Sequence, residues 1–344
     1  MHLHGVFFRV HARGTALTDT TYALPDERLA VTELLLAGTS RSLSWNAERA
    51  GNWVKGSRTA AVPPRSPRAS ASLRLHVTER SLAPGAPAFA YVLERDGRSP
   101  AGDSLEAPES TLVLRQGEPT QITVLNHTSH GTAVHWHGME IESFYDGAAG
   151  WSGSGARTAP LIAPGDSFVV RITPPRAGTF IYHTHARERA QLSGGLYGAL
   201  LVLPRGATRD TTDRLIVLAD STAADFILRT PPSLIKGSTR PEPLELTVGT
   251  SHQLRFIGIS AVSQRVVRLL HDTVLVAWTP LAKDGADLPR HQLRSERATR
   301  TFSAGETFDL AFTPTDTGTL TLQVTSLSRA PIVTSVAIRV RARR

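Results

Sequence analysis

The chain has 344 residues, of which 40% are hydrophobic and 20% are charged, which is typical of a globular protein with two or three domains. No apolar run is long enough to cross a bilayer. The net charge of +8 could attract a polyanion, but arginine is spread along the chain and no nucleic-acid-binding motif is present. We therefore expect neither nucleic acid nor a membrane as a partner. The absence of cysteine excludes disulfides, thiolate metal sites and cysteine nucleophiles.

The first 54 residues predict β-strands. Apolar residues alternate with polar ones in Val6–Val10, Leu29–Leu34 and Ser42–Trp45, and turns with glycine separate these runs. From Lys55 to Ser72 the alternation stops, and arginine, serine, alanine and proline follow without periodicity. We expect an irregular backbone over residues 55–72.

Strand patterns resume at Leu73–Val77 and continue through residues 111–125 to Leu196–Val202. A further series runs from Leu215 to Arg339, with turn residues about every ten positions, as in β-sandwiches. The sequence predicts an all-β protein of tandem sandwiches. Its expected domains are an incomplete one at 1–72, a second at 73–205 and a third at 206–344.

An internal repeat supports this organisation. Residues 165–185 align without a gap on residues 305–325, and the same frame fits residues 38–58. The matched positions include Gly165 with Gly305 and Gly178 with Gly318. The chain thus reads as three copies of one sandwich, roughly 130 to 140 residues apart. The first copy lacks its front half.

Histidine pairs are the strongest functional signal. His2 and His4, His135 and His137, and His183 and His185 each stand two positions apart, whereas chance predicts roughly half of one such pair in this composition. On a strand, residues two apart point to the same face. Each pair therefore offers two imidazoles to one metal site or to two adjacent sites. The spacing alone suits zinc as well as copper.

These motifs resemble the multicopper oxidases, the laccase-like family. The resemblance rests on His135-Trp136-His137-Gly138, Asp146-Gly147, Ala163–Phe168, Ala177–His185 and Gly195–Ala199, and on Met1–Gly5, which is similar to the end of the family motif His-x-x-His-x-His-Gly. It implies a fold of cupredoxin-like Greek-key sandwiches. It also implies a periplasmic or secreted location, although no signal peptide is visible.

The resemblance implies copper as the cofactor and dioxygen and a small reducing substrate as partners. In the family, a type 1 copper accepts electrons from a phenolic, amine or metal substrate, and a trinuclear cluster reduces dioxygen to water. By motif, His2 and His135 would be type 2 ligands, and His4, His137, His183 and His185 would be type 3 ligands. Asp146, which follows His137 by nine residues, would deliver protons or support a ligand. Its alternative reading is an Asp-Gly turn.

Parts of the family pattern are missing. The first histidine of the His-x-x-His-x-His motif would precede Met1, and the His-Cys-His motif would fall on Gly56-Ser57-Arg58. The resemblance therefore implies a partial type 3 site and no type 1 site.

We interpret Met1 as an internal methionine of a longer parent, with residues 55–72 replacing a deleted or out-of-frame piece; a naturally short family member is the alternative. Two other functions remain open, a catalytically inactive scaffold that binds proteins and a zinc hydrolase. Assembly as a homo-oligomer is a further expectation, because shorter members of the family form rings.

Overall fold

The computed structural model describes residues 7–14, 19–23, 27–32, 40–44, 69–79, 88–94, 111–154, 157–186, 188–220, 231–259, 264–327 and 331–343. In these ranges the chain is almost entirely β-strand and turn, and α1 (Glu188–Ser193) is the one α-helix. The predicted all-β class is confirmed. No helix in these ranges has the length and hydropathy needed to cross a membrane.

The chain divides into two compact units. The first contains residues 1–207 together with 284–286, and the second contains residues 208–283 and 287–344. The predicted boundaries after residues 72 and 205 stay predictions.

The strands of the first unit form several small sheets. They are β1 (Phe8–Gly14), β2 (Asp19–Thr21), β3 (Arg28–Ala30), β4 (Ser40–Ser44), β5 (Ala71–Glu79), β6 (Phe89–Leu93), β7 (Leu112–Arg115), β8 (Thr120–Asn126), β9 (Val134–His137), β10 (Gly153–Ser154), β11 (Arg157–Thr158), β12 (Ser167–Ile172), β13 (Gly178–Thr184) and β14 (Tyr197–Leu203), with the 3-10 turn η2 (Ser143–Tyr145) after β9. In the first sheet β1 pairs with β2, β3 and β4. Phe8, Val10 and Ala30 form its small apolar core.

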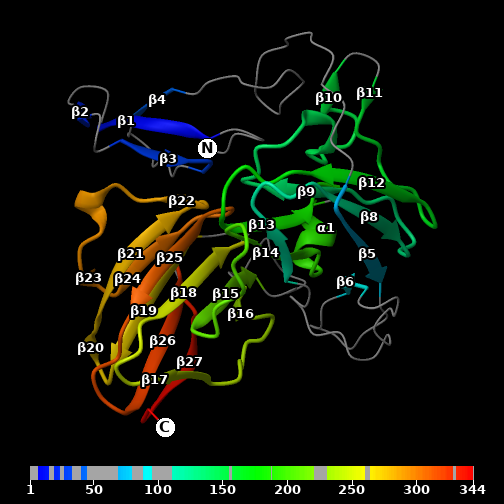
Figure 1. The fold of residues 1–344 in the computed structure, drawn as a ribbon. Helices are drawn as coiled ribbons and strands as arrows, with labels where there is room; N and C mark the ends of the chain where they lie inside the picture. Colours follow the sequence, from blue (N-terminus) through cyan, green and yellow to red (C-terminus); the bar gives the residue numbers. More distant parts are fainter. Residues whose placement is uncertain are drawn as a thin grey trace. The chain divides into compact units, whose positions relative to one another are not determined.

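Two four-stranded sheets follow, with strand orders β12-β8-β5-β6 and β7-β14-β13-β9 (Figure 1). Residues alternate between buried and half-buried along β8, as expected when one face of a sheet covers a core. Every residue of β14 is buried. The common core contains Leu75, Val124 and Leu200, so the two sheets pack as a sandwich. This sandwich supplies the strands that carry His135, His137 and His183.

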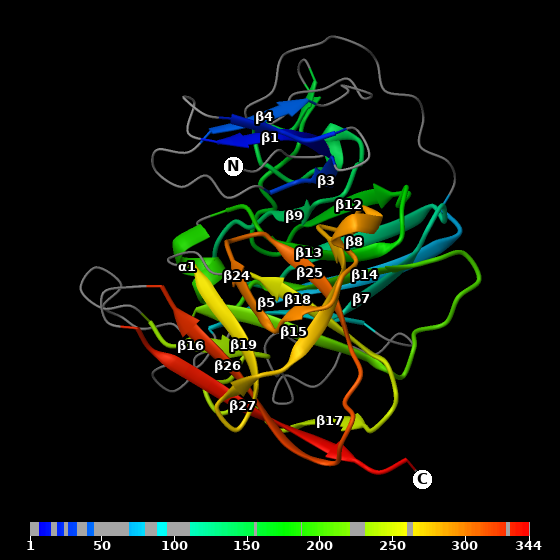
Figure 2. The same cartoon turned by 90° about the vertical axis from the view of Figure 1, so that its left-hand side faces the viewer.

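The second unit is another sandwich. Its elements are β15 (Asp213–Asp220), β16 (Ser233–Ile235), β17 (Leu244–Thr247), β18 (His252–Gly258), β19 (Arg265–His271), β20 (Val274–Leu275), β21 (Ala277–Lys283), η3 (Arg290–Gln292), β23 (Glu296–Arg297), β24 (Thr299–Phe302), β25 (Thr307–Phe312), β26 (Gly318–Ser326) and β27 (Val333–Arg341). The short strand β22 (Ala286–Asp287) spans the division between the units. The long strands β26 and β27 lie side by side and antiparallel (Figure 2). Phe256, Trp278 and Leu322 belong to the core between its sheets.

The internal repeat has a structural counterpart. In the frame of the repeat, β12 starts and ends at the positions of β25, and β13 starts at the position of β26. Gly165 and Gly305 both have positive φ, at 77° and 80°, a conformation that glycine adopts at little cost. The corresponding second half of the first copy, from residue 45, lies outside the described residues, as does the segment 55–68.

Candidate metal centre

The centre is built by two adjacent antiparallel strands, β9 and β13. In their register His135 faces His183 and Trp136 faces Tyr182. Because side chains alternate between the two faces of a strand, the histidines lie on one face and the two aromatic residues on the other. The cross-strand pairing therefore places imidazoles from both motifs together.

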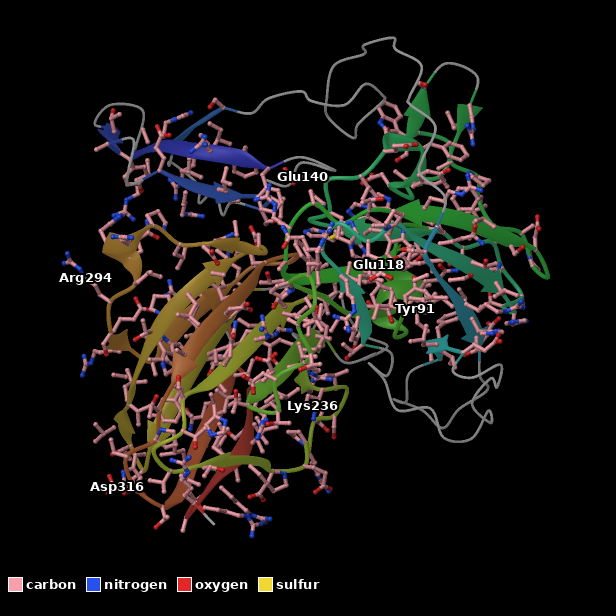
Figure 3. All side chains as sticks on the ribbon, in the orientation of Figure 1. Tyr91, Glu118, Glu140, Lys236, Arg294 and Asp316 are labelled. Carbon is pink, nitrogen blue, oxygen red and sulfur yellow. The ribbon has the colours of Figure 1, made fainter. Side chains whose placement is uncertain are left out.

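The opposite face anchors these strands in the core. The rings of Trp136 and Tyr182 stack with their centroids 6.0 Å apart, and Tyr91 lies 5.0 Å from Tyr182; Tyr91 is labelled in Figure 3. Burial raises the pKa of both tyrosines above the usual value for a phenol, so they stay neutral. Trp136 and Tyr182 both belong to the hydrophobic core of this unit.

Three histidines form the cluster. His135, His137 and His183 are buried, and each offers one ring nitrogen within 4.8 Å of the others. His183 Nε2 lies 3.4 Å from His137 Nδ1. Such converging imidazole nitrogens are the usual ligand arrangement of a transition-metal site.

Hydrogen bonds on the outer side of the rings set which nitrogens point inward. His135 Nδ1 lies 2.7 Å from the Asp146 carbonyl oxygen, and His183 Nδ1 lies 2.8 Å from the carbonyl of Thr184. A carbonyl only accepts, so each of these Nδ1 atoms carries the proton. The Nε2 atoms of His135 and His183 therefore present lone pairs, the state required of a metal ligand.

Asp146 lies directly behind His135. Its side chain is fully buried, and one carboxylate oxygen is 3.5 Å from His135 Nδ1. The hydroxyl of Ser152 donates to the other oxygen over 3.3 Å. The chain bends at Asp146, and Gly147 after it has a φ of 89°. The bend and the contact with His135 thus coexist, while the proton-delivery role stays a prediction.

The other predicted ligands are His185, which the structure describes, and His2 and His4, which it does not. His185 is half-buried, and its ring centroid is 5.5 Å from that of His135 and 6.2 Å from that of His183. It borders the three-histidine cluster. His2 and His4 lie outside the described residues, so their convergence on the cluster stays a prediction.

Gln191 on α1 is a residue of the site that the sequence did not reveal. It is 1% exposed, and its carbonyl oxygen accepts hydrogen bonds from Thr132 (3.0 Å) and Thr184 (2.7 Å). Its amide donates to the Gly131 carbonyl over 3.0 Å. These bonds connect the residues just before β9 with Thr184, the last residue of β13, which is next to His183. A glutamine six residues after a His-x-His pair belongs to no motif that would have identified it.

The donor set fits copper. Neutral imidazole is a good ligand for copper and zinc, whereas calcium and magnesium prefer oxygen ligands. Fold and site together define a β-sandwich protein with a buried imidazole cluster suited to a transition metal.

Comparison with known proteins narrows this class. The model of the multicopper oxidase family matches residues 104–207. A multicopper oxidase, MCE, from Talaromyces pinophilus is 39% identical over 100 residues, which are 28% of this chain and 15% of that protein. The laccase ustL from Ustilaginoidea virens is 34% identical over 110 residues, 31% of this chain and 16% of that protein. The chain thus matches only a small part of the length of these relatives.

Solved structures share the fold. The blue copper oxidase from Nitrosomonas europaea aligns with a TM-score of 0.60 at 18% identity, over 78% of this chain and 85% of that one. The laccase from Botrytis aclada aligns with a TM-score of 0.57 at 22% identity, over 79% of this chain and 53% of that one. The cupredoxin-like fold predicted from the resemblance is confirmed. Residues 104–207 thus match the multicopper oxidase family, and the chain shares the fold of solved multicopper oxidases.

Proposed function

We propose that this chain binds copper through His135, His137 and His183. The observation that carries the proposal is the convergence of three buried ring nitrogens within 4.8 Å. The multicopper oxidase match covers all three residues. By their motifs, His135 belongs to a type 2 site with His2, and His137, His183 and His185 belong to a partial type 3 site with His4.

The protein contributes ligand orientation and a water-poor environment. Outer hydrogen bonds hold the rings of His135 and His183, so the lone pairs need not reorganise when a cation arrives. Bound copper would supply an open coordination position for dioxygen and a centre that accepts electrons. The carboxylate of Asp146, close to the His135 ring, is proposed to hold or pass protons during dioxygen reduction.

The proposed reaction is the family's oxidation of phenolic, amine or metal substrates coupled to dioxygen reduction. A type 1 copper takes a cysteine ligand, and these 344 residues contain none. Copper bound to this chain is therefore expected to lack the intense blue absorption of a copper–thiolate bond, and turnover is expected to be low. A periplasmic or secreted location and homo-oligomeric assembly stay proposals.

Copper content after reconstitution tests this function. The purified chain is loaded with copper, freed of excess by gel filtration and analysed for metal, next to His135→Gln and His271→Gln. His271 is exposed on β19, so H271Q controls for the loss of any histidine. We expect wild type and H271Q to retain copper stoichiometrically and H135Q to lose most of it. Equal, substoichiometric copper in all three would support the scaffold alternative.

A further inference from the structure

Thr32, from the segment that follows β3, lies against the metal ligand His137. Its hydroxyl oxygen is 3.3 Å from His137 Nε2. The other ring nitrogen, Nδ1, is the one that lies 3.4 Å from His183 Nε2. Thr32 is 4% exposed and His137 is 6% exposed. One nitrogen of His137 thus faces the cluster, and the opposite nitrogen faces the Thr32 hydroxyl.

Two contacts hold Thr32 in this position. The backbone N–H groups of Val31 and Thr32 donate to one carboxylate oxygen of Asp284, over 3.2 and 3.1 Å. The Val31 side chain is buried in the same core as Trp136. It packs over Gly138, where an added Cβ would lie 3.5 Å from a Val31 methyl. Asp284 has a φ of 51°, a conformation that aspartate tolerates better than most residues.

We propose that Thr32 is a positioning residue for copper, because its hydroxyl accepts the Nε2 proton of His137 and leaves Nδ1 as the ligand atom. This inference rests on the proposed copper site. For His135 and His183 a backbone carbonyl performs the same task. A carbonyl can only accept, whereas a hydroxyl can also donate, so the tautomer of His137 is the point to be tested. The role also gives the N-terminal segment a function in the site that does not depend on His2 or His4.

The tautomer can be measured without any metal. Long-range ¹H–¹⁵N correlation spectra of the copper-free protein distinguish Nδ1–H from Nε2–H imidazole, and His137→Gln assigns the signals. We expect His137 as the Nε2–H tautomer in wild type and in Thr32→Ser, which keeps the hydroxyl. Thr32→Val keeps the shape without the hydroxyl, and a mixture of tautomers is expected there. An Nδ1–H tautomer of His137 in wild type would overturn the proposal, even if T32V failed to fold.

Copper affinity gives the second readout. Partners of this kind typically change metal affinity about 10- to 100-fold, so we expect that loss in T32V and wild-type affinity in T32S. Thr334→Val is the matched control, because Thr334 is buried and its hydroxyl donates to the Ser233 carbonyl in the second unit. Equal affinity of T32V and T334V would contradict the proposal. If wild type bound no copper, the proposed function would fail, while the tautomer spectra would still test Thr32.

Discussion

Replacing Gly147 with alanine tests whether the turn behind His135 is held by close backbone packing. Gly147 has a φ of 89°, and an alanine Cβ would lie 1.8 Å from the Val134 carbonyl oxygen. The left-handed backbone disfavours alanine by about 1–2 kcal/mol. Relief of the clash needs movement of the backbone of β9 or of the turn, and overpacking of this kind typically adds about 1–3 kcal/mol.

Gly165→Ala separates the two effects. Gly165 has a similar φ of 77°, but no atom lies within 4 Å of its added Cβ. Both substitutions carry the free-energy cost of alanine in a left-handed backbone, and only G147A adds the clash with the Val134 carbonyl oxygen. Urea unfolding followed by near-UV circular dichroism should therefore show G147A less stable than G165A by about 1–3 kcal/mol. Because the turn carries the Asp146 carbonyl that holds His135, G147A should also bind copper more weakly.

A free energy of unfolding for G147A within about 0.5 kcal/mol of that for G165A would refute this reasoning, since surface substitutions without a specific defect already vary by that amount. It would mean that the Asp146–Gly147 turn relaxes freely and does not fix the position of His135.

Two further substitutions test the surroundings of the cluster and the second unit. Gln191→Leu should lower the free energy of unfolding by on the order of 2–4 kcal/mol, because the buried hydroxyls of Thr132 and Thr184 and the Gly131 carbonyl lose their partner. Unchanged urea unfolding would show that Gln191 does not hold β13. His252 is 2% exposed, and burial lowers its pKa. The unfolded chain therefore takes up a proton on His252 near pH 6.5 and the folded chain only at lower pH, so stability should fall as the pH drops below about 6.5. Thermal unfolding from about pH 8 to about pH 5 should show a smaller loss in His252→Gln, and equal losses would contradict the assignment.

The sequence predicted which histidines share a face of each strand but not which strands pair with each other. Alternation placed His135 with His137 and His183 with His185, because side-chain direction along a strand is a local property. Their convergence depends on the register that sets His135 opposite His183. That register arises from pairing between segments more than 40 residues apart, so no local pattern contains it.

The elements and contacts that the sequence missed lack a local signal. Helix α1 has six residues, too few for helical periodicity to stand out. Strand β6 is a short apolar run, Phe89–Leu93, which could have been recognised as a buried strand. Thr32 and Gln191 are single polar residues whose importance comes from the atoms beside them in the fold. By contrast, the successive strands β12 and β13, which lie in different sheets, and their copies β25 and β26 follow the repeat directly, with glycines of positive φ at matching positions.

The most direct test of the copper site is anomalous X-ray scattering from crystals of the copper-loaded chain at the copper absorption edge. We expect one anomalous peak about 2 Å from His135 Nε2 and another about 2 Å from His137 Nδ1 and His183 Nε2, the usual length of a metal–imidazole bond. Crystals of His135→Gln should show the peak beside residue 135 weakened or lost. Fully loaded crystals with copper elsewhere, and none among these three nitrogens, would contradict the assignment of the cluster as the metal centre.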